Sequence, residues 1–197
     1  MHNNKTIITE PRWKRYIVET NKPIFTSKLC KEIIDLSTTL EKEQGKIGGD
    51  EVVDTRGKKL RQSTICWIDF NKMQPVYDDI DNLIQKINRN NFGFNDIQIT
   101  ERAQFAEYFK GQFYEWHMDS NIDMDKEPTV RKLSMTVLLN DPKEFEGGNL
   151  EIAGKTLSHM KQGHAAIFAS FLQHRVIPVT KGTRKSLVMW FGGEPFK

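Results

Sequence analysis

The segment WHMDS contains two residues that could bind a metal ion together, His117 and Asp119. Because they are two positions apart, their side chains would leave the same face of a β-strand. An imidazole and a carboxylate so placed can coordinate the same metal ion. An H-x-D triplet is also common in ordinary structure, so a site requires a third ligand.

Three histidines downstream are candidates for that ligand: His159, His164 and His174. His159 lies in a polar stretch, and His164 follows a glycine and could begin an inward-facing strand. We favour His174, which Arg184 follows ten residues later. Two imidazoles and one carboxylate form a facial triad that leaves one side of an octahedral iron open.

Arg184 favours iron over zinc, which could use the same three ligands. A buried guanidinium on the strand after the third ligand can hold a dicarboxylate through a bidentate, charge-assisted pair. A hydrolytic zinc site would not need such a group. The residues therefore indicate a redox iron site with an anionic cosubstrate.

Composition limits the class of protein that must position these residues. A chain of 197 residues, 38% hydrophobic, suits one packed core. It has no apolar run of membrane-spanning length and no signal-peptide core near its start, and Cys30 and Cys66 lack metal-ligand spacing. We therefore expect reduced, buried thiols and a cytoplasmic protein without membrane attachment.

Charge is unevenly distributed along the chain. From Lys155 onward there are seven Lys or Arg and one acid, a balance of 7 − 1 = +6, whereas the whole chain carries +3. This basic part is either a solvated face or a site for an anionic cosubstrate or substrate.

Hydrophobic periodicity predicts helices in the first half of the chain and strands in the second. Helices are expected over about 24–44, capped by Thr26 or Ser27, and over about 75–88, with a loop over 45–59 and a strand over 63–70. The strand runs that follow are 105–109, 132–140, 149–152, 164–169, 173–179 and 184–191.

This pattern indicates a mainly β (α+β) sandwich or jelly roll with helices buttressing one face. No linker marks a boundary. We expect one domain over 1–197, in which a helical support region with a strand (1–95) carries a jelly-roll core with the metal site (96–193).

The residues also carry a family resemblance. The order Tyr108, Gly111, Tyr114, His117-x-Asp119, followed by KLSMTVLLNDPKEFEGGNLEI, KQGHAAIFAS and HRVIPVTKGTRKSLVMWF, resembles the prolyl-4-hydroxylase-like branch of the Fe(II)/2-oxoglutarate dioxygenases. It is most similar to PKHD-type hydroxylases of bacteria and phages. The resemblance covers roughly 103–193.

By this resemblance the fold is a double-stranded β-helix, the cupin-like jelly roll, with iron ligands His117, Asp119 and His174. Arg184 is then expected on the far carboxylate of 2-oxoglutarate, and Tyr108 near that cosubstrate. Ser134 or Thr183 could add a hydroxyl to the carboxylate pocket, or could serve only strand packing or a turn. The neighbouring residues Trp116 and Trp190 are expected to pack in the core or line the pocket.

The implied reaction is hydroxylation of a C–H bond with O2 as oxidant, release of succinate and CO2, and ascorbate as a possible stimulant. The expected substrate is a peptidyl residue, proline first. Alternatives are a free small molecule, a nucleobase or other nucleic-acid substrate, and a non-catalytic jelly-roll binding module. The loops 45–59 and 120–129, with the acidic residues Asp123, Asp125 and Glu127, are expected to shape specificity. No pattern indicates an oligomeric state.

Overall fold

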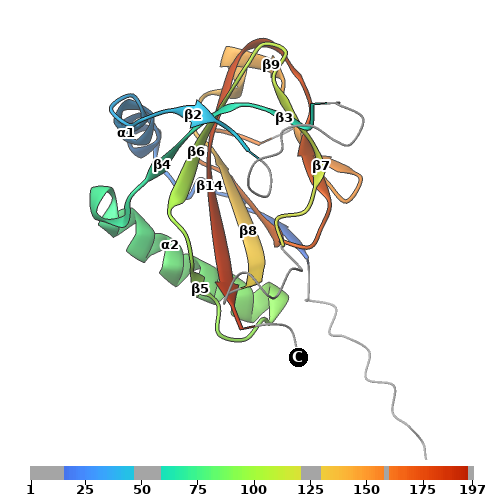
Figure 1. Ribbon diagram of the computed structural model, residues 1–197. Helices are drawn as coiled ribbons and strands as arrows, with labels where there is room; N and C mark the ends of the chain where they lie inside the picture. The colour runs from blue at the N-terminus through green and yellow to red at the C-terminus, as the bar shows by residue number, and fades with distance from the viewer. Residues whose placement is uncertain (1–15, 47–58, 121–129, 158–159, 195–197) are drawn as a thin grey trace, which may run out of the picture.

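The protein is built around two antiparallel sheets (Figure 1). The computed structural model describes residues 16–46, 59–120, 130–157 and 160–194. The larger sheet runs in the order β1 (Ile17–Glu19), β12 (Ala165–Ala169), β8 (Val130–Leu138), β14 (Val179–Gly193), β6 (Ala103–Phe109), β4 (Thr64–Ile68) and β2 (Glu43–Gln44), and β5 (Gln98–Ile99) and β9 (Phe145–Gly147) also pair with β14. The smaller sheet runs β11 (Lys155–Leu157), β10 (Leu150–Ile152), β13 (His174–Val176), β7 (Phe113–His117) and β3 (Arg61–Gln62).

The two faces of the larger sheet bury different side chains. On β8, Leu133, Met135 and Val137 point into a core shared with the helices. Ser134 lies between them on the opposite face, where it contacts Asp119. That face packs against the smaller sheet, as Phe168 of β12 and Ile152 of β10 belong to one buried cluster. The strand predicted over 132–140 is confirmed as β8, and the mainly β jelly-roll class is correct.

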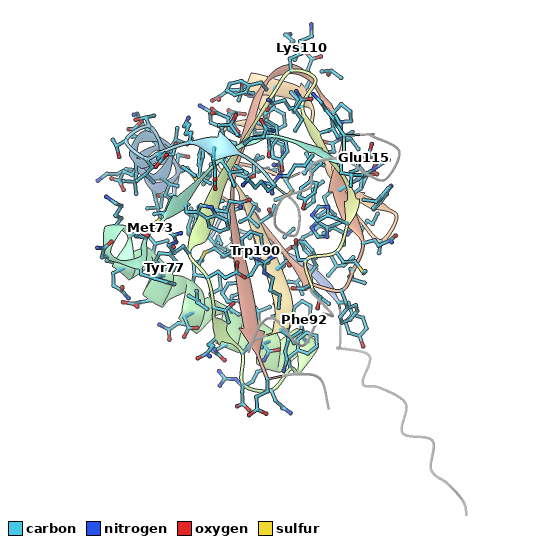
Figure 2. The ribbon with its side chains drawn as sticks, in the orientation of Figure 1. Met73, Tyr77, Phe92, Lys110, Glu115 and Trp190 are labelled. Atoms are coloured by element: carbon cyan, nitrogen blue, oxygen red, sulfur yellow. The ribbon has the colours of Figure 1, made fainter. Side chains whose placement is uncertain are left out.

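Two helices cover the outer face of the larger sheet (Figure 1). They are α1 (Ser27–Ser37), capped by the Thr26 hydroxyl as predicted, and α2 (Gln74–Ile87), with a proline in its first turn. The Tyr77 hydroxyl of α2 donates 2.6 Å to Ile68 O and accepts from Ala103 N at 2.6 Å (Figure 2). The helix is thereby tied to both β4 and β6.

Helix α1 is shorter than the sequence pattern indicated. The expected helix extended to about residue 44, but α1 ends at Ser37, and residues 43–44 form β2. The hydroxyls of Ser37, Thr38 and Thr39 donate to carbonyls three residues back, at 2.6 to 2.8 Å. Such local bonds compete with continuation of a helix.

The remaining elements are short. They are the 3-10 turns η1 (Phe70–Lys72) and η3 (Pro142–Glu144) and the π-helical turn η2 (Asn88–Phe92), which extends α2. Within the described ranges, no helix has the length and apolar character needed to cross a membrane.

Candidate metal centre

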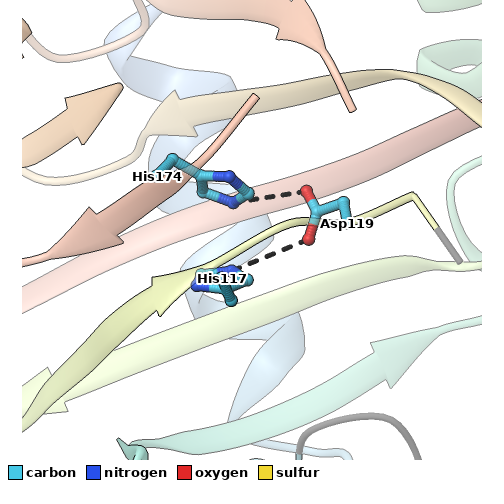
Figure 3. Close-up of side chains that lie close together, drawn as sticks. All are labelled: His117, Asp119 and His174. Atoms are coloured by element: carbon cyan, nitrogen blue, oxygen red, sulfur yellow. Dashed lines mark ion pairs between the residues drawn. The ribbon is translucent and has the colours of Figure 1, made fainter. Parts of the chain in front are cut away.

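Three side chains converge at the edge where β7 meets β13 (Figure 3). His117 ends β7, Asp119 follows two residues later, and His174 begins β13 directly opposite His117. Asp119 Oδ1 lies 3.7 Å from His117 Nε2, and Asp119 Oδ2 lies 3.4 Å from His174 Nε2. One ligand atom from each lies within 4.8 Å of the others, close enough to surround a single ion.

Backbone carbonyls orient both imidazoles. His117 Nδ1 lies 2.8 Å from Glu115 O, and His174 Nδ1 lies 3.0 Å from Leu172 O. A carbonyl only accepts, so Nδ1 must carry the hydrogen in both rings. This leaves Nε2 of each ring directed at Asp119, the arrangement that metal-binding histidines use.

The electrostatics of the site favour a negatively charged Asp119, which suits binding of a cation. Burial would raise the pKa of Asp119, but the adjacent His174 and the hydrogen bonds from His174 and Ser134 outweigh it, so the pKa lies well below its ordinary range. Burial lowers the pKa of His174, yet the Asp119 carboxylate raises it by more. Burial, followed by repulsion from His174, lowers the pKa of His117 to about 3. The Asp119 carboxylate therefore favours the protonated form of His174, and binding of a divalent cation would oppose that protonation.

Ser134 holds the Asp119 carboxylate, and Ser170 holds Ser134 and the backbone of Asp119. Ser134 Oγ donates to Asp119 Oδ2 at 2.6 Å and lies 2.9 Å from Ser170 Oγ. The backbone N–H groups of Asp119 and Ser120 both donate to Ser170 O at 3.0 Å. Ser134, expected at the cosubstrate carboxylate, is thus placed beside Asp119 of the His-Asp-His cluster. Sequence reasoning missed Ser170, which only the pairing of β12 with β8 brings here.

Arg184 is buried on β14, 3% exposed, and no carboxylate of the described chain pairs with it. Its Nη1 donates to Ser186 Oγ at 2.9 Å, and its guanidinium lies 5.7 Å from the Tyr108 ring centroid. Burial lowers its pKa, since a lone cation in an apolar interior is costly. Ser186 was also missed, although its spacing of two from Arg184 places it on the same face of a strand.

A cavity of about 190 Å³ opens beside this guanidinium. Arg184 is its one charged wall residue, and the rest of the described lining is Leu138, Pro142, Phe145, Gly147, Gly148, Asn149, Leu150, Leu157 and Met160. A small anion fits this combination of one buried cation with polar backbone and aliphatic side chains.

The other predicted residues lie apart from the centre or outside the described ranges. His164 Nδ1 contacts Thr20 O at 2.8 Å and is not in the cluster. Trp116 is neither core nor pocket: it is 39% exposed on the outer face of β7, under Arg175. Thr183 O accepts from the Asn140 amide at 2.9 Å, which ties β14 to the end of β8. The positions outside the described residues are His159, most of the loop 45–59, and residues 121–129 with their three acids.

Comparison with known proteins agrees with this geometry. Residues 103–192 match the family model of the 2OG-Fe(II) oxygenase superfamily. A PKHD-type hydroxylase of Xanthomonas campestris pv. campestris strain B100 is 32% identical over 94 residues, 44% of this chain and 41% of that protein. A PKHD-type hydroxylase of Psychrobacter sp. strain PRwf-1 is 36% identical over 92 residues, 44% and 36% of the two chains. The chain thus spans about two fifths of the length of the curated relatives it matches.

Solved structures share the fold over nearly the whole chain. A viral collagen prolyl hydroxylase of Paramecium Bursaria Chlorella virus-1, in its 2OG complex, has a TM-score of 0.70 at 18% identity, over 91% of this chain and 97% of that one. A prolyl-4-hydroxylase of Pseudomonas putida has a TM-score of 0.68 at 22% identity, over 89% and 92%.

The chain thus has the jelly-roll fold of these solved structures, and three side chains that could hold one metal ion converge in it. Residues 103–192 match the 2OG-Fe(II) oxygenase superfamily and are similar in sequence to PKHD-type hydroxylases. The superfamily match implies Fe(II), 2-oxoglutarate and O2, and the His-Asp-His cluster is chemically suited to the iron.

Proposed function

We propose that the protein is an Fe(II)- and 2-oxoglutarate-dependent dioxygenase that hydroxylates a C–H bond. The observation that carries this proposal is the convergence of His117, Asp119 and His174 in one jelly roll that also buries Arg184 without a carboxylate partner. A binding module would have no need to maintain all four groups, because a cation buried without a partner is destabilising.

Each residue has a distinct role in this proposal. Nε2 of His117, Nε2 of His174 and a carboxylate oxygen of Asp119 hold Fe(II), while Arg184 and the Ser186 hydroxyl bind the far carboxylate of 2-oxoglutarate. Tyr108 is buried with its ring centroid 5.7 Å from Arg184 Cζ, so it supports the guanidinium that would bind the cosubstrate. When bound, iron and 2-oxoglutarate would activate O2, one oxygen atom of which enters the hydroxylated product and the other succinate, with release of CO2. The protein's part is to orient both and to exclude water.

For the substrate we propose a peptidyl residue, with proline first. Structural neighbours include prolyl hydroxylases, one of them, from Trichoplax adhaerens, in complex with a hypoxia inducible factor peptide. In addition, Trp190 is buried on β14 (Figure 2), and its indole N–H has no acceptor among the described residues. Its strand partner is Ser134, the residue that holds Asp119. A substrate carbonyl beside the centre would satisfy this donor.

We also propose that the whole chain is a single oxygenase domain acting in the cytoplasm. In support of one domain, Ile33 of α1 and Ile84 of α2 lie in the same buried cluster as Leu187 of β14. Strand β4, from the first half, also pairs with β6 in register.

The test is succinate production by purified protein with Fe(II), ascorbate, O2 and 2-oxoglutarate, each omitted in turn. Slow turnover that requires iron and 2-oxoglutarate, without added substrate, is the expected result. A protein without turnover should still show an iron–2-oxoglutarate charge-transfer band under anaerobic conditions. Absence of both would favour a binding module, and salt-sensitive binding of oligonucleotides would favour a nucleobase substrate.

A further inference from the structure

A second buried arginine, Arg61 on β3, lies on the metal-ligand side of the protein. It is 6% exposed, and all three of its nitrogens donate: Nε to Ser63 Oγ at 2.8 Å, Nη1 to Lys46 O at 2.9 Å, and Nη2 to Gln104 Oε1 at 2.8 Å. The guanidinium plane is therefore fixed. Gly45 closes the same cage, because a Cβ there would lie 2.5 Å from Arg61 Nε.

The fixed guanidinium covers a tyrosine that in turn covers a metal ligand. Arg61 lies opposite Tyr114 in the β3–β7 register, and its Cζ is 4.5 Å from the Tyr114 ring centroid. The Tyr114 ring stacks on the His117 imidazole with centroids 3.4 Å apart and planes inclined by 11°. The three planar groups form a continuous stack from the cage to the metal centre.

This stack restrains tilting of the His117 ring, which the hydrogen bond from His117 Nδ1 to Glu115 O does not prevent. A single bond from Nδ1 to Glu115 O tolerates some tilting of the His117 ring. A ring packed against one face opposes that tilt, provided that the ring itself is held in place. The caged guanidinium provides the fixed surface, which a flexible lysine ammonium could not.

We propose that Arg61 is a positioning residue of the metal centre: through Tyr114 it sets the plane of His117 and so the direction of Nε2. The inference rests on the proposed function only in taking His117 as a ligand. Arg61 does not contact the metal, so its effect must vanish when the Tyr114 ring is absent.

The experiment is a double-mutant cycle read out by Co(II) binding, with the visible spectrum reporting coordination and metal-free thermal unfolding reporting stability. Arg61→Met and Tyr114→Leu should each weaken Co(II) binding by about 10- to 100-fold, the usual effect of removing a group that orients a metal ligand. The Arg61→Met/Tyr114→Leu double variant should bind no more weakly than Tyr114→Leu alone. Tyr114→Phe, which keeps the ring, should stay within about threefold of wild type.

Arg102→Met is the matched control, because Arg102 also lies over an aromatic ring, that of Trp67, but pairs with Asp69 away from the ligands. Its Co(II) affinity should be unchanged. If Arg61→Met does not fold, Arg61→Lys and Gln104→Met test the same link. Lower stability with unchanged Co(II) affinity and spectrum would overturn the proposal, as would additive losses in the double variant. Wild-type protein that binds no Co(II) would instead overturn the metal centre itself.

Discussion

Ser134 donates a 2.6 Å hydrogen bond to Oδ2 of Asp119. The bond turns the carboxylate so that Oδ1 faces His117, while the same Oδ2 lies 3.4 Å from His174 Nε2. Ser134 therefore orients a ligand from one side, as the backbone carbonyls orient the imidazoles from the other.

Replacing this serine should affect metal binding and not cosubstrate binding. Ser134→Ala is expected to weaken Fe(II) or Co(II) affinity by about 10- to 100-fold. Ser186→Ala, which removes the hydroxyl beside Arg184, is the matched control, and it should weaken only 2-oxoglutarate affinity. Calorimetric titration with each ligand distinguishes them. The reverse pattern would place Ser134 in the carboxylate pocket.

Removal of a ligand should abolish metal binding. His174→Ala leaves only two protein ligands, so little iron should remain after anaerobic loading and desalting, as measured by elemental analysis. His164→Ala is the control, because His164 bonds Thr20 O away from the cluster. Iron stoichiometry near that of wild type in His174→Ala would remove His174 from the ligand set.

Arg184→Met should separate cosubstrate binding from stability. Loss of the charge is expected to weaken 2-oxoglutarate binding by about 2 to 5 kcal/mol. The ligand-free variant should be at least as stable as wild type, since a buried cation without a carboxylate partner is exchanged for an apolar chain. Thermal unfolding with and without 2-oxoglutarate measures both effects. A normal ligand-induced shift in the variant would contradict the role of Arg184.

The absence of a side chain at Gly148 leaves room for the Arg184 side chain. The φ of Gly148 is +62°, and an added Cβ would lie 2.9 Å from Val179 Cγ2 and 3.1 Å from Arg184 Cδ. Gly148→Ala should therefore weaken 2-oxoglutarate binding as well as destabilise the fold. Gly111→Ala separates the two effects, because Gly111 has φ +85° and open space around it. It should lose only about 1 kcal/mol of unfolding free energy, and equal 2-oxoglutarate affinities in the two variants would exclude the steric explanation.

The cysteines should be unreactive in the native state. Both are fully buried, and desolvation raises the pKa of Cys30 and Cys66 from 9.0 to about 11. A disulfide reagent at pH 8 should label them only when the chain unfolds in urea. The unfolded thiols ionise first, so their contribution to stability should fall as pH rises from about 9 to 11. Rapid native labelling would contradict the burial.

The hydrophobic periodicity of a segment predicted which of its side chains face the core, because this depends only on the geometry of that strand or helix. The two-residue period of β8 placed Ser134 on the face opposite Leu133, and the three- and four-residue steps of α2 placed Ile80 and Ile84 on its buried side. Residue type and order also singled out His117, Asp119 and His174, which the structure brings together as one candidate metal cluster. The hydrogen bond from Ser134 to Asp119 could not be predicted from the sequence, because it depends on where the chain after β7 passes β8.

Contacts between distant strands escaped prediction for the same reason. Strand β3 has only two residues, too few for a periodic signal, and Arg61 meets Tyr114 only because β3 pairs with β7. Helix α1 was predicted too long because Leu40 continued its apolar spacing, whereas the Ser37–Thr39 hydroxyls ended the helix.

The pairing of β4 with β6 indicates whether a fragment limited to residues 103–192 would be soluble. Residues 103–192 match the superfamily model. Strand β4, which lies outside this portion, pairs with one edge of β6. Helices α1 and α2, also outside it, cover the apolar face of β14. A fragment limited to the matched residues would expose both an unpaired strand edge and a hydrophobic surface. Such a fragment should self-associate into aggregates, so β4, α1 and α2 keep the matched portion of this jelly roll soluble.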